Sequence, residues 1–306
     1  MSREALLGTD DKNMLYKFAT KGNELSDSQK KALWTTKIAT GVILTISGIV
    51  GLIVSLVWEE QIGLELNVTT DYRTGAALDP DNFPNIEFTK FDPGFQVPVA
   101  ASVVSIIAGL ANFLAVGCHG AEMFQLANNM NPYIWGGFLA WHWLAFLVFA
   151  TLSGVHNILQ LTLIGAGVFA WCAFFWLADS EQRYGYQYAR SQSNKQVSSV
   201  WSWIPVAFAL VFAIIVYAVL IAHIVNTFGA DAFDGPGIEQ GWWLAIVLAH
   251  LGLYLITPVV FIIWRAGWIS QIYTREMILY IFNAIFATAT TWVTIGLLGA
   301  DHVTLP

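Results

Sequence analysis

Seven apolar stretches of 20 to 25 residues limit what this chain can fold into more than any other feature. About 20 helical residues cross a hydrocarbon core about 30 Å thick, so each stretch is long enough to span a membrane. Because backbone groups in lipid must bond internally, and because the stretches lack polar–apolar alternation, they indicate helices rather than barrel strands. We therefore predict an all-α, multi-pass integral membrane protein. The predicted spans are Ile38–Trp58, Val97–Cys118, Tyr133–Leu152, Ile158–Ala178, Trp201–Val225, Trp242–Trp264 and Met277–Gly299.

The overall composition supports this class. Apolar residues make up 56% of the chain and charged residues 11%, and a soluble surface cannot be covered with so few polar groups. The two cysteines, Cys118 and Cys172, both fall in predicted spans. They are therefore interpreted as small buried apolar residues rather than as a disulfide.

The basic residues predict how the bundle is oriented, because Lys and Arg collect on the cytoplasmic side of a membrane protein. Twelve of them precede the first span or fall in the fourth and sixth connections, whereas only Arg73 and Lys90 fall on the other side. We therefore expect a cytoplasmic N-terminus and an outer C-terminus. Acidic residues gather in the outer connections, so nucleic acid is not an expected partner.

The spans divide the chain into three parts. Residues 1–37 are predicted to form a cytoplasmic N-terminal tail, residues 38–299 the seven-helix transmembrane domain, and residues 300–306 a short outer C-terminus. The tail is polar and contains no cleavable signal, so we expect the N-terminus to be mature. Ser26 or Asp27 is suited to cap a short helix that leads into the first span.

The connection from residue 59 to 96 is too long for a plain link within a compact bundle. Two segments of alternating polarity, LELNVTTDY and NIEFTKF, flank a part rich in Gly, Pro and Asp. This pattern predicts an outer β-hairpin with a wide loop. Asn67 begins an Asn-Val-Thr triplet there, the acceptor sequence for glycosylation on an outer surface.

The third and fourth spans carry a resemblance to a known family. The segment NMNPYIWGGFLAW, with Asn131 and Trp135, resembles the entry to the third helix of heliorhodopsins. The segment from Ser153 to Gln182 resembles their fourth helix, and the match continues to Glu276 and Trp292 in the last span. Heliorhodopsins also share the seven helices, the inside N-terminus and a long ribbon after the first helix.

The resemblance implies where a retinal site would lie and shows that its charged groups are absent. In heliorhodopsins the Schiff-base lysine lies five residues before the tryptophan of the seventh helix, which places Ala287 at that position. The counterion glutamate follows the third-helix tryptophan by two residues, which places Gly137 there. No lysine follows Lys195 anywhere in the chain. The absence of both charges together is physically consistent, because a buried carboxylate without its cation would destabilise the fold.

Aromatic residues around these positions are the remaining candidates for a ligand site. They would line an apolar cavity able to hold a lipid, carotenoid or retinoid without a covalent bond, although such rings more often simply fill the space. The expected lining residues are Phe138, Trp141, His142, Trp171, Ala287, Thr291 and Trp292.

Other polar residues of the spans suggest no catalytic centre or metal site. No two histidines have the spacing that places both imidazoles on one helix face, so we predict no metal. Glu122 follows the second span and is expected to be solvated. Pro258 is expected to break a backbone hydrogen bond and to kink the sixth span.

These observations favour a non-enzymatic protein with no covalent cofactor. The leading interpretation is a heliorhodopsin-like bundle that has lost covalent retinal binding and serves as a structural or accessory subunit of a larger membrane complex. We expect membrane lipids and either a second copy of the chain or other membrane subunits as partners. The alternative is a sensory or signalling protein that binds a lipid, carotenoid or retinoid noncovalently.

Overall fold

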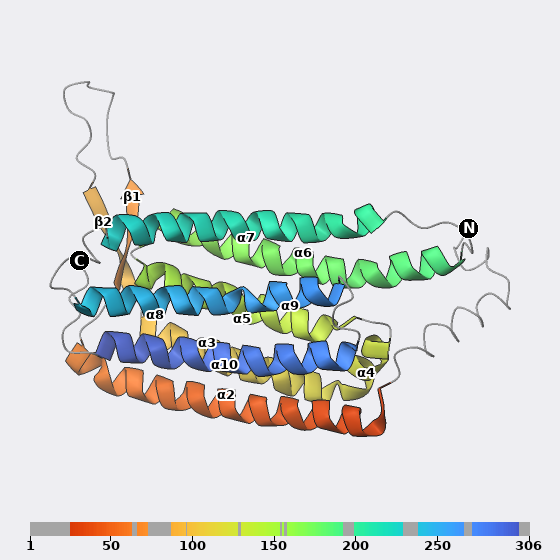
Figure 1. The fold of residues 1–306 in the computed structure, drawn as a ribbon. Helices are drawn as coiled ribbons and strands as arrows, with labels where there is room; N and C mark the ends of the chain where they lie inside the picture. The colour runs from red at the N-terminus through yellow and green to blue at the C-terminus, as the bar shows by residue number, and fades with distance from the viewer. Residues whose placement is uncertain are drawn as a thin grey trace.

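A computed structural model gives the fold of the chain (Figure 1). It describes residues 25–62, 66–72, 87–95, 97–127, 130–153, 155, 158–191, 199–228, 238–265 and 271–299. Within these ranges, seven helical segments are long and apolar enough to cross a membrane. The prediction of a seven-helix, multi-pass membrane protein is confirmed at this level.

The helices follow the predicted spans, with some differences at their ends. The first helix begins before its span, and the fourth extends beyond it. The elements are α2 (Asp27–Ile62), β1 (Leu66–Tyr72), β2 (Glu87–Phe95), α3 (Val97–Gly117), α4 (His119–Ala127), α5 (Pro132–Leu152), α6 (Ile158–Ser191), α7 (Ser199–Phe228), α8 (Ile238–Tyr254), α9 (Ile256–Arg265) and α10 (Ile272–Gly299).

The long helices run side by side along one common direction (Figure 1). Helices α2, α3 and α10 pack together on one side of the bundle, and α6 and α7 pack together on the other. Helix α5 lies between them, in contact with both α3 and α6, and it is the most buried of the spans. Functional groups on α5 are therefore enclosed by the other helices.

The first helix starts at a capping box rather than at the first apolar residue. The Ser26 hydroxyl accepts from the Gln29 backbone N–H, and the Gln29 side chain accepts from the Ser26 N–H at 3.0 Å. This reciprocal pair satisfies two backbone donors that a helix start leaves free. Helix α2 therefore begins at Asp27, inside the segment expected to be a tail, and it carries Lys37 into the bundle.

Glycines allow α2 and α3 to approach closely. A Cβ atom built on Gly48 would lie 2.8 Å from the Ser102 carbonyl oxygen, and one built on Gly109 would lie 3.0 Å from the Gly41 carbonyl oxygen. Small residues at such contacts let helix backbones pack together in lipid. This contact fixes the position of α2 against the rest of the bundle.

The expected break in the hydrogen bonding near Pro258 is seen as an interruption between α8 and α9. Proline cannot donate to the carbonyl four residues earlier, that of Tyr254, and its ring crowds that group. Leu255 N–H turns to the Gly252 carbonyl at 3.2 Å instead of continuing the α-helix. The Leu251 carbonyl accepts from the Tyr217 hydroxyl at 2.8 Å, so a neighbouring helix satisfies an acceptor that the break leaves free.

The connection between α2 and α3 contains two strands. β1 and β2 pair antiparallel, with an irregularity of register between Leu66 and Val68. They lie at the end of the bundle opposite α4 (Figure 1). The side chain of Asn67 and the wide loop expected at residues 73–86 lie outside what the structure describes.

Candidate functional site

Ala287, at the position that the resemblance gives to the retinal lysine, lies in a tight contact between α10 and α3. Its side chain is fully buried. The Ser105 hydroxyl donates to the Ala287 carbonyl at 2.7 Å. One turn further along α10, the Thr291 hydroxyl lies 2.7 Å from that of Ser105 and 2.8 Å from the Ala101 carbonyl. The segment thus joins two helices through hydroxyl–carbonyl bonds.

Aromatic rings pack against one another beside this contact. The Tyr254 ring lies 4.5 Å from the Phe286 ring and 4.6 Å from the Phe146 ring, centroid to centroid. His142 contacts Trp141 at 4.0 Å, and its other ring neighbours are Phe138 and Tyr254. Offset and edge-to-face pairs of this kind stabilise an interior beyond their area of burial. The middle of the bundle is therefore filled with side chains from α5, α8 and α10.

One histidine of this interior contacts a threonine of the last helix. The Thr290 hydroxyl donates to the Phe286 carbonyl at 2.9 Å. The same hydroxyl oxygen lies 3.1 Å from His250 Nε2 and 3.3 Å from the Tyr254 hydroxyl oxygen. These hydrogen bonds join α8 to α10 and give His250 a structural partner.

The residues expected to line an apolar cavity fall into three groups. Phe138 and Trp141 border a small cavity beside Gly137. His142 and Trp171 belong to the packed aromatic interior, and Ala287 and Thr291 belong to the contact between α3 and α10.

Trp292 lies elsewhere, on the outer face of α10. Its side chain is 40% exposed, and its indole N–H donates to the Ser47 hydroxyl at 2.8 Å. The helix turns by about 100° per residue, so Trp292 faces outward when its neighbour Thr291 faces α3. The sequence expectation placed it in the cavity because the register of the last helix was not known.

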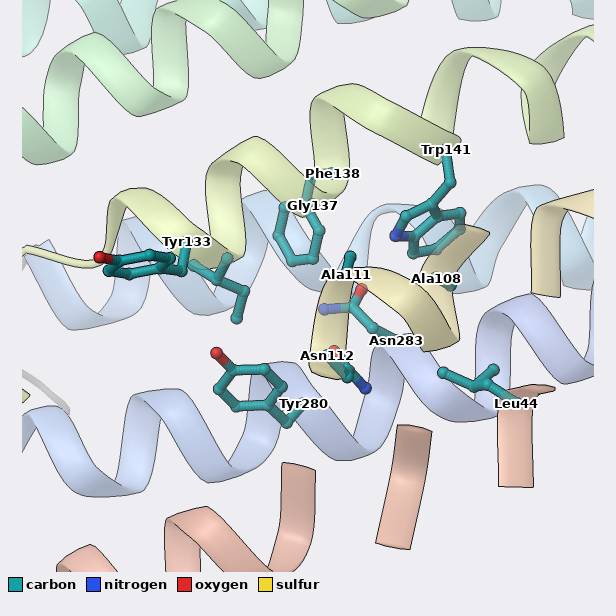
Figure 2. Close-up of a pocket in the computed structure, with 11 residues that line it drawn as sticks. Leu44, Ala108, Ala111, Asn112, Tyr133, Gly137, Phe138, Trp141, Tyr280 and Asn283 are labelled. Atoms are coloured by element: carbon teal, nitrogen blue, oxygen red, sulfur yellow. The ribbon is translucent and has the colours of Figure 1, made fainter. Parts of the chain in front are cut away.

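The cavity lies between α2, α3, α5 and α10 (Figure 2). It leaves about 10 Å³ for the centre of a water molecule, which is room for about one water. Both side-chain polar atoms of Asn283 are buried without a hydrogen-bond partner. The lining residues are Leu44, Ala108, Ala111, Asn112, Tyr133, Ile134, Gly137, Phe138, Trp141, Tyr280 and Asn283.

A buried ionic network occupies the α4 end of the bundle. Lys37 of α2 forms an ion pair with Glu122 of α4, and both side chains are fully buried. The expectation of a solvated Glu122 is therefore wrong, because α4 turns back against α2 and α10. The Tyr280 hydroxyl donates to Glu122 Oε1 at 2.8 Å. Tyr280 also borders the cavity, so the network and the cavity share a residue.

The second half of the network joins α6 to α10. Arg275 Nη1 donates to Asp179 Oδ1 at 2.8 Å, and Arg275 Nε donates to Glu276 Oε1 at the same distance. The Arg275 guanidinium also stacks on the Trp264 ring, 4.0 Å from its centroid. Asp179 Oδ2 accepts from the Trp135 indole at 3.1 Å. All the charged groups here are buried.

Asn131 connects the two halves. Its Nδ2 donates to both Glu122 Oε1 and Glu276 Oε2, and its backbone N–H donates to Asp179 Oδ2 at 2.8 Å. Its Oδ1 accepts from the first N–H groups of α5 and so caps that helix. Through its side chain and its backbone N–H, one residue thus serves three carboxylates and a helix start.

The network balances most of its charge internally. Two cations, Lys37 and Arg275, face three carboxylates, and every carboxylate oxygen accepts at least one hydrogen bond or ion pair. Glu122 lies in the first turn of α4, and Asp179 accepts from the backbone N–H of Asn131, the residue that caps the start of α5. The positive ends of those helix dipoles offset part of the excess negative charge.

His119 lies at the edge of the network and is only partly buried. Its Nδ1 is 3.5 Å from Lys37 Nζ. Burial, and then the charge of Lys37, lower the pKa of His119 below its ordinary value of 6.5. Across the described ranges, no cluster of three or more His, Cys, Asp or Glu side chains is arranged to hold a metal ion.

Sequence reasoning did not identify this network as a site. Lys37 and the Arg275–Glu276 pair were visible as charges at the ends of apolar spans, a position that suggests a buried partner. Their partners are far away in the sequence, however, and no spacing rule links them. Asn131 and Glu276 entered only as points of family resemblance.

Comparison with known proteins assigns no family. The sequence matches no model of a known protein family, and no curated protein matches it either.

Proposed function

We propose that this protein is a heliorhodopsin-like membrane protein that has lost covalent retinal binding and acts without enzymatic activity, as a structural or accessory subunit of a larger membrane complex. The proposal rests on the resemblance in the third, fourth and seventh helices. In that alignment the lysine and counterion positions are Ala287 and Gly137.

The observation that carries the proposal is the environment of Ala287. The residue is fully buried, its carbonyl accepts from Ser105, and packed aromatic rings lie beside it. The cavity next to Gly137 has room for about one water. These features favour a helix that completes the bundle by packing. A noncovalent carotenoid or retinoid is the less supported alternative, because it would need a much larger chamber at this place.

Retinal addition tests the loss of covalent binding. A retinal aldehyde forms an imine only with a primary amine. The predicted spans contain no lysine, and the lysines of α2, which are Lys30, Lys31 and Lys37, all lie near its start. The purified chain, incubated with all-trans retinal, should develop no red-shifted band. A red-shifted band, together with a retinyl group on a buried lysine after borohydride treatment and denaturation, would overturn the proposal.

The subunit role and the orientation need separate measurements. Native mass determination after extraction in mild detergent should show a second copy or another membrane protein with the chain, and a lone monomer would count against a subunit.

The proposed inside N-terminus follows from the distribution of Lys and Arg. Protease added to the cytoplasmic face of sealed vesicles should therefore leave the connection of residues 59–96 intact.

A further inference from the structure

Asn283 presents an unsatisfied amide to the cavity between α2, α3, α5 and α10. Its side chain is 7% exposed, and both Nδ2 and Oδ1 are buried without a partner. Figure 2 shows the amide among Phe138, Trp141 and Asn112. A buried amide without hydrogen bonds is unfavourable, because it has lost its bonds to water and gained none in the protein. The unsatisfied amide therefore favours the binding of a polar ligand in this cavity.

The chemistry of the amide defines that ligand. Nδ2 needs an acceptor and Oδ1 needs a donor, so a simple cation, which only accepts lone pairs, would leave Nδ2 unsatisfied. The available space fits about one water. A water molecule supplies both functions at that size. Tyr280 also borders the cavity, and because its hydroxyl donates to Glu122, its oxygen lone pairs can accept a further hydrogen bond.

We propose that the cavity is an internal hydration site, in which an ordered water bonds to the Asn283 amide. Polar contacts link His119, at the edge, through Lys37 and Glu122 to Tyr280, and Tyr280 borders the cavity that holds the water. The site does not depend on the proposed loss of retinal binding, since it rests on the amide and the cavity alone.

Radiolytic labelling tests the proposal on the intact chain in lipid nanodiscs. Short X-ray pulses convert bound water to hydroxyl radicals, which oxidise the side chains next to it, and mass spectrometry locates the products. Phe138 and Trp141 border the cavity, whereas Phe149 and Trp171 are similarly buried but do not border it. We expect Phe138 and Trp141 to be oxidised several-fold faster than these two residues of the same type. If the unmodified protein showed equal oxidation rates for the cavity residues and the two control residues, the proposal would be overturned.

The variant Asn283→Leu tests whether the amide holds the water. Leucine has a similar size and offers no hydrogen bond, so oxidation of Phe138 and Trp141 should fall to the level of the buried controls. Thr294→Val is the matched control, because Thr294 is a buried residue of the same helix whose hydroxyl also lacks a partner but does not border the cavity. It should leave the labelling unchanged. Unaltered labelling in Asn283→Leu would overturn the assignment of the water to Asn283.

Discussion

Lys37 and Glu122 form an ion pair in which both side chains are fully buried. Removing two charges from water costs several kcal/mol per ion, and the pair is stable only because further hydrogen bonds satisfy the carboxylate. Asn131 and Tyr280 supply these bonds to Glu122 Oε1. The pair therefore depends on the correct mutual placement of α2, α4, α5 and α10, and it should favour this arrangement over other packings of the same helices.

Replacing Lys37 with methionine should destabilise the protein strongly. The change leaves Glu122 as a buried, uncompensated charge, a loss that typically costs about 3–5 kcal/mol. Thermal unfolding in detergent should show a much lower midpoint. The double variant Lys37→Met/Glu122→Gln should recover part of the loss because it removes the unpaired charge.

Lys30 offers the control for this experiment. It pairs with Asp27 on the exposed start of the same helix, and exposed pairs contribute about 0–1 kcal/mol. Lys30→Met should therefore change the midpoint little. A Lys37→Met protein as stable as Lys30→Met would show that the ion pair does not hold the bundle together.

Substitutions at Asn131 separate its capping role from its role among the carboxylates. Serine and aspartate both keep an oxygen acceptor suited to the start of α5, but aspartate adds a fourth buried carboxylate beside Glu122, Asp179 and Glu276. Asn131→Asp should be less stable than Asn131→Ser by at least about 2 kcal/mol, since buried unpaired charges cost more than neutral groups. Thermal unfolding of the two variants measures the difference. Equal midpoints would mean that water reaches the network and screens it.

The sequence predicts the seven helices well because a long apolar run without polar–apolar alternation is stable in lipid only as a helix. It also predicts a helix cap at Ser26 or Asp27, and the capping box at Ser26 agrees with that prediction. It does not predict that the capped helix continues without a break into the first span, since Lys30, Lys31 and Lys37 interrupt the hydropathy. The network could not be predicted, because Glu122 meets Tyr280 and Lys37 only through the packing of separate helices. The same packing decides that Trp292 lies on the outer face of α10, so the sequence alone did not predict its position.

The close contact between α2 and α3 predicts that one added methyl group there destabilises the protein. In Gly48→Ala the new methyl group would meet the backbone of Ser102 and Ile106 at 2.8 Å, and overpacking of this kind costs about 1–3 kcal/mol. Gly136 of α5 has nothing within 4 Å of the same position. Gly136→Ala should be neutral or stabilising by up to about 1 kcal/mol through helix propensity. Similar unfolding midpoints for the two variants would contradict the close approach of α2 and α3.

His119 predicts a loss of stability on mild acidification. Its pKa in the folded protein is lowered from 6.5, first by burial and then by Lys37, against a smaller opposing effect of Glu122. Between that lowered pKa and 6.5 the unfolded chain binds more protons than the folded one, so stability falls as the pH falls through this window. His119→Gln should reduce the fall between about pH 7 and pH 5 in the pH dependence of the unfolding midpoint. If His119→Gln and the unmodified protein had the same pH dependence of the unfolding midpoint, His119 would be excluded as the source of the acid destabilisation.

The packed interior around Ala287 predicts that restoring the two charged groups alone does not restore a pigment. Ala287→Lys supplies the amine, and Gly137→Glu supplies a carboxylate that would keep a resulting imine protonated. A Cβ on residue 137 would lie 3.2 Å from the Ala111 Cβ, so Ala111→Gly in the same chain gives the new side chain room. The cavity beside Gly137 still has room for only about one water, and packed aromatic rings lie beside Ala287. All-trans retinal should therefore give this triple variant no red-shifted band. A red-shifted band that borohydride removes, leaving a retinyl group on residue 287, would show that packing at Ala287 is not what excludes the chromophore.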